Sequence, residues 1–198
     1  LLGWGDPGIT SIASIQLGSI FAVIIYFWKD IQFILKGCSD LFIRNNRGTP
    51  QSRLALSILI GNIPIIFIGL VIKLFWTDYE TSFLRTPFVI AIVSISMALL
   101  LAIAEKAGSK TRSLNQIRIS DGLVIGLAQL LALIPGVSRS GITITSSLFS
   151  GIQRSASARF SFLLGIPAIS LAGLVELKTA IYDFTTPGLT LLIVGIIS

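Results

Sequence analysis

The sequence contains no histidine and a single cysteine, Cys38, among its 198 residues. A lone cysteine excludes a disulfide framework, and the chain has none of the Cys and His spacings of a zinc site. The lack of histidine also excludes a Ser-His-Asp triad built within this chain. We therefore expect Cys38 to be a passive small residue, and any chemistry carried here must use other side chains.

Charged residues are scarce as well. They make up 12% of the sequence, against 53% hydrophobic residues, whereas about 25% of the residues of a soluble domain are charged. This composition predicts an integral membrane protein. The formal net charge is +6, but the basic residues lie in short segments between apolar stretches and form no basic face with interleaved aromatic residues. We therefore expect no nucleic acid among the partners.

The long apolar stretches predict an all-α, polytopic integral membrane protein, because about 20 apolar residues allow a helix to cross a bilayer. We predict a single transmembrane domain over residues 1–198, with spans at about 9–28, 54–76, 87–104 and 160–177, a re-entrant segment at 121–152 and a partial span at 187–198. The mixed, basic segment 29–53 predicts a short helix that lies on the membrane surface. Segment 153–159 predicts a polar link.

Each of the first two predicted spans contains one amide side chain, Gln16 and Asn62. For Gln16 we favour a hydrogen bond that packs one helix against another over a place in a pocket. Asn62 precedes Pro64, which removes a backbone hydrogen bond and predicts a kink. Asn62 therefore either relieves that kink or faces the site, and the sequence leaves both interpretations open.

Lysine and arginine are concentrated in alternate connectors. Five lie in 29–53, four in 105–118 and two in 153–159, whereas 77–86 and 178–186 hold one each. Because cytoplasmic loops carry an excess of basic residues, the first three connectors are predicted to be cytoplasmic. The re-entrant segment 121–152 then enters the membrane from the cytoplasm.

The polar, glycine-bracketed stretch 135–145 lies between two apolar runs and contains Arg139. An unpaired arginine at the centre of a bilayer costs between about 3 and more than 10 kcal/mol, so such a residue usually marks a function. The proline and the glycines of the stretch would each interrupt a continuous helix. We predict a re-entrant hairpin of two half-helices that meet at 135–141. The alternative is an ordinary helix end from which Arg139 reaches the lipid headgroups.

Such a turn would form an anion site. Free backbone N–H groups at the start of the second half-helix, hydroxyl groups and one guanidinium would converge on a phosphate. We predict Arg139, Ser138 and Thr143 as catalytic residues, and Ser140, Gly136, Gly141 and Gln129 as residues that bind the substrate phosphate. Ser138 could itself act as the nucleophile, although the chain offers it no neighbouring base.

The carboxylates near this segment predict structural roles. Ser120 and Asp121 together suit the N-cap of the first half-helix, where a carboxylate meets the positive end of the helix dipole. Gly122 and Gly126 are four residues apart and would let that half-helix pack closely against a neighbour. Glu176, at the end of its span, is interpreted as a surface carboxylate rather than a metal ligand.

The run QLLALIPGVSRSGIT at 129–143 resembles the second signature of the undecaprenyl-diphosphate phosphatase family. The resemblance extends over nearly the whole chain: IQLGSI at 15–20 followed by YFW at 26–28, GNIP at 61–64, and FSFLL at 160–164 with IPA at 166–168 are similar to other segments of that family in the same order.

The resemblance implies a function and a setting. It implies hydrolysis of undecaprenyl diphosphate to undecaprenyl phosphate and phosphate, which recycles the lipid carrier of peptidoglycan synthesis and confers bacitracin resistance. It also implies a multi-pass protein of the bacterial plasma (inner) membrane, with Mg²⁺ or Ca²⁺ as cofactor and with a polyprenyl diphosphate and the bilayer as partners. A homodimer is a further expectation. The implied fold is an inverted-repeat helical bundle, with a second hairpin that enters from the opposite face.

The family's first signature, a pair of glutamates followed by serines, a threonine and a histidine, has no match in the chain. We therefore expect a fragment that lacks the N-terminal signature and the C-terminal end of the family. It would then lack the metal ligands and be inactive, with no metal site among its own residues. The alternative function is a transporter or flippase of a phosphorylated lipid or small anion, because broken helices also serve transport. A carboxylate at mid-span would favour that alternative, and none of the predicted spans contains one.

Overall fold

The computed structural model describes residues 20, 22–43, 46, 48–75 and 82–182. Contacts within the chain divide it into two compact units, Leu1–Ile31 with Gly165–Ser198, and Gln32–Leu164. The described residues form helices and contain no β-strand, apart from an isolated bridge between Arg112 and Ile152. The predicted all-α class is therefore confirmed.

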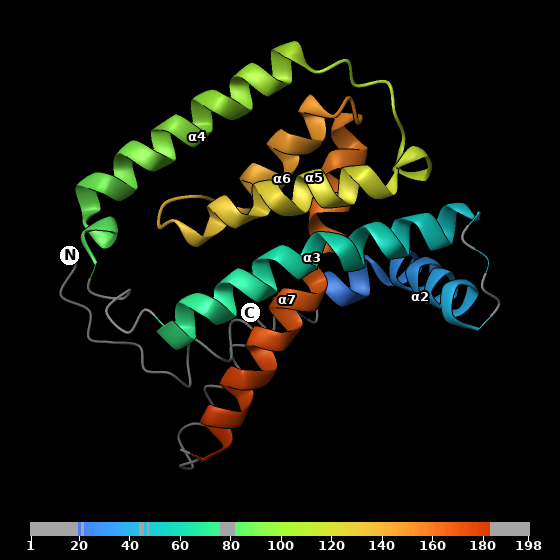
Figure 1. The fold of residues 1–198 in the computed structure, drawn as a ribbon, viewed down its shortest axis with the longest axis horizontal. Helices are drawn as coiled ribbons and strands as arrows, with labels where there is room; N and C mark the ends of the chain where they lie inside the picture. Colours follow the sequence, from blue (N-terminus) through green and yellow to red (C-terminus); the bar gives the residue numbers. More distant parts are fainter. Residues whose placement is uncertain (1–19, 21, 44–45, 47, 76–81, 183–198) are drawn as a thin grey trace. The chain divides into compact units, whose positions relative to one another are not determined.

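Six α-helices and three short 3₁₀ helices carry the described fold (Figure 1). The α-helices are α2 (Trp28–Phe42), α3 (Pro50–Phe75), α4 (Pro87–Ala107), α5 (Ile119–Gln129), α6 (Arg139–Phe149) and α7 (Arg154–Tyr182). The 3₁₀ helices are η2 (Phe83–Arg85), η3 (Leu114–Gln116) and η4 (Leu130–Leu133). Helix α2 provides the helix predicted within 29–53.

The helix ends differ from the predicted spans where polar residues continue a helix. Helix α7 begins at Arg154, whereas the sequence predicted a polar link over 153–159, because serine and arginine reduce the apolar signal without breaking a helix. The helices continue through Pro64 in α3 and Pro167 in α7. The predicted span 187–198 and most of 9–28 lie outside the described residues. So do Gln16 and the side chain of Glu176.

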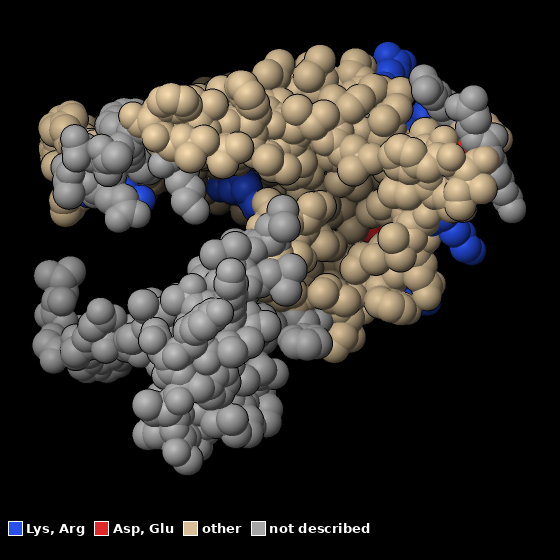
Figure 2. Space-filling model, turned by 60° about the horizontal axis from the view of Figure 1, so that its bottom comes forward, with Lys and Arg blue, Asp and Glu red and all other residues tan. Residues whose placement is uncertain are grey.

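The described part of the chain has the surface of a membrane protein. Two of its helices, Pro50–Ile72 and Pro87–Ala107, are long and apolar enough to cross a membrane. Helix α4 exposes large apolar side chains along its whole length: Phe88, Ile92, Ile95, Leu99 and Ile103. On the face shown in Figure 2, uncharged residues predominate and Lys and Arg occur only at separate places. Such a surface is stable in lipid, where apolar side chains need no shielding from water.

Helices α3 and α5 pack with their backbones in close contact, side by side and in the same direction. A Cβ placed on Gly122 would lie 2.4 Å from the carbonyl oxygen of Ser57, and one placed on Gly126 would lie 2.4 Å from that of Gly61. The small residues are four apart on both helices, which is the arrangement that lets membrane helices approach closely. The close packing predicted for Gly122 and Gly126 is confirmed.

Asn62 joins α3 to α7. Its Nδ2 donates hydrogen bonds to the carbonyls of Ile58 (2.9 Å) and Leu164 (3.1 Å). The side chain is buried, at 4% exposure. The amide therefore bridges two helices, while its buried Oδ1 has no hydrogen-bond partner among the described residues. The two interpretations left open by the sequence stay predictions.

Arg112 holds together the outer ends of the hairpin formed by α5 and α6. Its guanidinium pairs with the Asp121 carboxylate and donates hydrogen bonds to the carbonyls of Gln116 (2.8 Å) and Ser150 (3.1 Å). The hydrogen bond that Arg112 donates to Asp121 raises the pKa of Arg112. The loop before α5 is thereby tied both to the start of α5 and to the end of α6.

Asp121 stabilises the start of α5 from a different position than predicted. The N-cap residue is Arg118, and the Asp121 carboxylate, in the first turn, accepts the N–H of Arg118 at 2.7 Å. The prediction that Ser120 and Asp121 form the cap is therefore wrong by two to three residues. The predicted structural role of the carboxylate near the positive end of the dipole agrees with this contact.

Candidate functional site

The helical backbone is interrupted at 135–138, within the predicted turn 135–141, and this segment lies between α5 and α6 in Figure 1. Helix α5 ends at Gln129, η4 continues to Leu133, and the N–H of Val137 bonds to the carbonyl of Ile134 (3.1 Å) to close a turn. Helix α6 then starts at Arg139. An unbroken helix through Arg139 is therefore excluded. The alternative left open by the sequence, an ordinary helix end from which Arg139 reaches the lipid headgroups, stays a prediction.

Gly136 gives this turn its shape. Its φ of +94° lies in the left-handed region, which residues other than glycine rarely adopt. A Cβ at this position would lie 2.7 Å from the carbonyl oxygen of Ile90 in α4. The carbonyl of Gly136 in turn accepts a hydrogen bond from the hydroxyl of Ser94 (3.0 Å). The turn is therefore fitted closely against α4.

Two serine hydroxyls lie at the N-terminus of α6. Ser138 is the N-cap residue, and its Oγ accepts the N–H of Gly141 at 3.2 Å. The Oγ atoms of Ser138 and Ser140 are 3.3 Å apart, and both residues are exposed. A hydroxyl pair at the positive end of a helix offers hydrogen-bond donors to an anion. We call Ser138 and Ser140 the serine pair.

Arg139 lies between the two members of the serine pair and is half-buried. As the first residue of α6, it adds its full charge to the partial positive charge of the helix end. Gly141 belongs to the same turn of helix, and a Cβ there would lie 3.1 Å from Cβ of Ser138. The predicted residues Ser138, Arg139, Ser140 and Gly141 are therefore brought together by the first turn of α6.

Thr143 is placed elsewhere. It is fully buried, and its Oγ1 lies within hydrogen-bond distance of the carbonyls of Arg139 (3.0 Å) and Ser140 (3.1 Å) and of Ser161 Oγ (2.6 Å). The hydroxyl therefore joins α6 to α7, and the partners it has in this structure are two backbone carbonyls and Ser161. Its assignment to the phosphate stays a prediction.

Gln129 is the last residue of α5 and is buried, at 1% exposure. Among the described residues, its Nε2 atom has no hydrogen-bond partner. A buried donor left unsatisfied costs about 1–3 kcal/mol. A polar group from a ligand or a water molecule would relieve this cost, which keeps Gln129 as a predicted binding residue.

The turn does not fit a divalent cation by itself. Mg²⁺ and Ca²⁺ prefer carboxylate and carbonyl oxygens, whereas the described turn offers serine hydroxyls and a positively charged guanidinium. In the part of the chain that the structure describes, no three His, Cys, Asp or Glu side chains come together. Burial raises the pKa of the Cys38 thiol in α2, which disfavours the thiolate that a metal would need.

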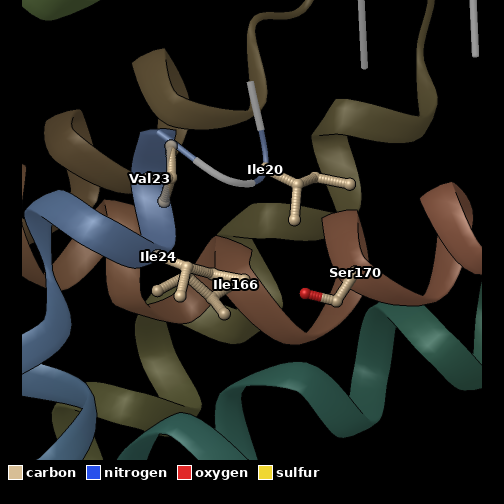
Figure 3. A pocket seen from close by; sticks show the side chains of 5 residues that line it. All are labelled: Ile20, Val23, Ile24, Ile166 and Ser170. Atoms are coloured by element: carbon tan, nitrogen blue, oxygen red, sulfur yellow. The ribbon is translucent and has the colours of Figure 1, made fainter. Parts of the chain in front are cut away.

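A small apolar pocket lies in the unit that contains residues 1–31 and 165–198. It is lined by Ile20, Val23, Ile24, Ile166 and Ser170 (Figure 3). The cavity volume is about 10 Å³, close to the room that one water molecule requires.

Two residues with contacts to the hairpin were missed by sequence reasoning. Ser94 bonds to the carbonyl of Gly136, and Ser161 bonds to the hydroxyl of Thr143. The signal that could have found them is a hydroxyl inside an otherwise apolar span. That signal is weak, because a serine in a membrane helix usually bonds to its own helix.

Comparisons with known proteins agree on one family. The family model "Bacitracin resistance protein BacA" matches residues 1–198. The chain is similar to the undecaprenyl-diphosphatase of Prochlorococcus marinus (strain MIT 9303), with 56% identity over 198 residues that cover 100% of this chain and 68% of that protein. It is also similar to the undecaprenyl-diphosphatase of Synechococcus sp. (strain WH7803), with 56% identity over 100% of this chain and 69% of the relative.

A further relative is the undecaprenyl-diphosphatase of Trichodesmium erythraeum (strain IMS101). It is 54% identical to the chain, and the alignment covers 100% of this chain and 64% of that protein. The chain therefore corresponds over its full length to about two thirds of each of these relatives.

Proposed function

The chain belongs to the family of bacitracin resistance protein BacA, and from this membership we propose that the protein hydrolyses undecaprenyl diphosphate to undecaprenyl phosphate and phosphate. The observation that carries the proposal is the match over all 198 residues, at 56% identity, to a protein named undecaprenyl-diphosphatase. The reaction recycles the lipid carrier of cell-wall synthesis. Removal of the diphosphate form confers resistance to bacitracin.

The first turn of α6 supplies the features that the chemistry requires. Phosphoryl transfer spreads negative charge over the phosphate oxygens, and catalysis depends on positioned groups that stabilise it. The Ser138 oxygen accepts the N–H of Gly141 and lies 3.3 Å from Ser140 Oγ, so one hydroxyl hydrogen of the serine pair stays available to a ligand and the other becomes available when that contact opens. With Ser140 as a second donor and Arg139 as a cation, the turn can hold a phosphate against the helix end.

The substrate explains why this turn belongs in a membrane protein. A polyprenyl tail remains in the bilayer, so the headgroup must be met by a site reachable from lipid. The exposed apolar surface of α4, against which the turn packs, fits a site of this kind. We propose a multi-pass protein of the plasma (inner) membrane, whose substrate is a polyprenyl diphosphate.

Two further features of the proposal concern the whole protein. We propose Mg²⁺ or Ca²⁺ as cofactor, where it would neutralise charge on the diphosphate, and we place its ligands outside the described turn, which lacks carboxylates. We also propose a homodimer. Phosphate release measured after chelation with EDTA, and again after each metal is returned, tests the metal cofactor. The molecular mass of the protein in detergent tests the homodimer.

The central test measures phosphate release from undecaprenyl diphosphate by the full-length protein in detergent. Release that requires Mg²⁺ or Ca²⁺, and that stops when the metal is chelated, is expected. The same protein in lipid vesicles provides the comparison. Movement of the lipid between leaflets without phosphate release under either metal would contradict the enzymatic function and favour a flippase.

A further inference from the structure

The hydroxyl of Ser94 forms a hydrogen bond outside its own helix. Serine side chains inside membrane helices commonly bond to the carbonyl four residues earlier, and Ser96 does so, with a hydrogen bond to the carbonyl of Ile92 at 2.9 Å. Ser94 lies two residues earlier in the same helix, yet its hydroxyl donates to the carbonyl of Gly136 at 3.0 Å. The two serines are therefore similar in setting and different in partner.

The position of Ser94 coincides with the closest approach between α4 and the turn. Ile90, one helical turn before Ser94 and on the same face of α4, lies so near Gly136 that an added Cβ would be 2.7 Å from its carbonyl oxygen. Gly136 has φ of +94°, so its carbonyl belongs to no helix and needs a separate partner. Ser94 provides that partner where water is scarce.

The contact lies close to the anion-binding groups along the chain. Gly136 is followed by Val137, whose N–H closes the turn on Ile134, and then by the N-cap Ser138. A change in the direction of the Gly136 carbonyl rotates the peptide that leads into the serine pair. We propose that Ser94 is a positioning residue, which holds the turn so that the serine pair and Arg139 meet the phosphate; this inference rests on the proposed function.

The first test compares Ser94→Ala with Ser96→Ala in the full-length protein. Loss of the Ser94 hydroxyl is expected to lower kcat/KM for phosphate release by about tenfold, because one hydrogen bond that orients the site is lost. Ser96→Ala, which removes a bond within one helix, should stay within about twofold of the wild type. Equal activity of the two variants would overturn the proposal.

The second test separates the hydroxyl from the volume of the side chain. Ser94→Thr keeps the hydroxyl. Ser94→Val gives a side chain of the same shape as threonine but without the hydroxyl. The threonine variant should retain most of the activity and the valine variant should resemble Ser94→Ala. Valine performing as well as threonine would overturn the proposal, and so would unfolding of both Ser94→Ala and Ser94→Val, since a positioning residue must be dispensable for folding.

The third test does not depend on activity. Hydrogen exchange in peptides that cover residues 134–142 should be faster in Ser94→Ala than in the wild type and unchanged in Ser96→Ala. If the wild type releases no phosphate, the proposed function fails while this measurement still decides whether Ser94 orders the turn. Exchange that is unchanged in Ser94→Ala would refute the inference even with an active enzyme.

Discussion

The shape of the candidate site depends on a residue without a side chain. Gly136 combines a left-handed backbone with a close approach to Ile90, and either feature alone disfavours a Cβ. The sequence predicted that this glycine shapes the turn. It could not predict the partner, because Ile90 is distant in the chain and nothing local to either residue records the contact.

Gly136→Ala is expected to destabilise the protein and to reduce phosphate release. The strained backbone costs about 1–2 kcal/mol, and the clash with Ile90 adds to it. The matched control is Gly69→Ala in α3, where the nearest atom is 4.0 Å from the added Cβ and a gain of about 0.5–1 kcal/mol in stability is expected. The melting temperatures of the two variants are compared by thermal unfolding. Equal melting temperatures would contradict the backbone strain and the clash assigned to Gly136→Ala.

Thr143 distinguishes a structural from a substrate-binding hydroxyl. We expect Thr143→Val to lower the free energy of unfolding by about 1–3 kcal/mol, because the buried hydroxyl of Ser161 loses its shorter hydrogen bond and keeps only the long one to the carbonyl of Ser140. In a double-mutant cycle, the stability lost by the variant with both Thr143→Val and Ser161→Ala should be smaller than the sum of the losses in the two single variants. Retained kcat/KM in the folded variant would assign Thr143 to packing, whereas a loss of activity without loss of stability would support the predicted contact with phosphate.

At the scale of elements, the hairpin is the part of the fold that the sequence predicted best. Proline and glycine interrupt a helix by local effects, so the break between α5 and α6 was visible without any tertiary information. The start of α7 was missed because polarity was taken as the end of a span. The ion pair of Arg112 with Asp121 was also missed, since pairing across a loop depends on how that loop folds.

This ion pair predicts a measurable difference between two arginines. Arg112→Ala leaves the Asp121 carboxylate, whose side chain is 9% exposed, without its ion-pair partner and with only the N–H of Arg118 as a donor among the described residues. A loss on the order of 2 kcal/mol in unfolding free energy is therefore expected. Arg154 pairs with Glu105 but has a side chain 72% exposed, so Arg154→Ala should cost far less. Chemical denaturation compares them, and equal losses would mean that Arg112 does not hold the hairpin.

At the scale of the whole molecule, composition was enough to predict a membrane protein with helices of spanning length. Helices α3 and α4 meet that expectation among the described residues. The site was predicted less completely: the first turn of α6 brings four of the predicted residues together, whereas the hydroxyl of Thr143 faces α7. A pattern along one helix cannot show which side a neighbouring helix covers.

The most direct test of the account replaces the cation of the turn. Arg139→Ala and Arg139→Lys are compared with Lys106→Ala, which removes an exposed positive charge from the last turn of α4. Removal of a group that stabilises transition-state charge typically costs about 10²–10³-fold in rate. Lysine should recover only part of the loss, because it cannot bind phosphate through two parallel hydrogen bonds.

The measurement is kcat/KM for phosphate release from undecaprenyl diphosphate by the folded full-length variants. We expect a loss of at least about 100-fold for Arg139→Ala, with Lys106→Ala close to the wild type. Activity of Arg139→Ala within about threefold of the wild type would contradict this expectation, because a change of that size is less than one hydrogen bond to a charged group contributes.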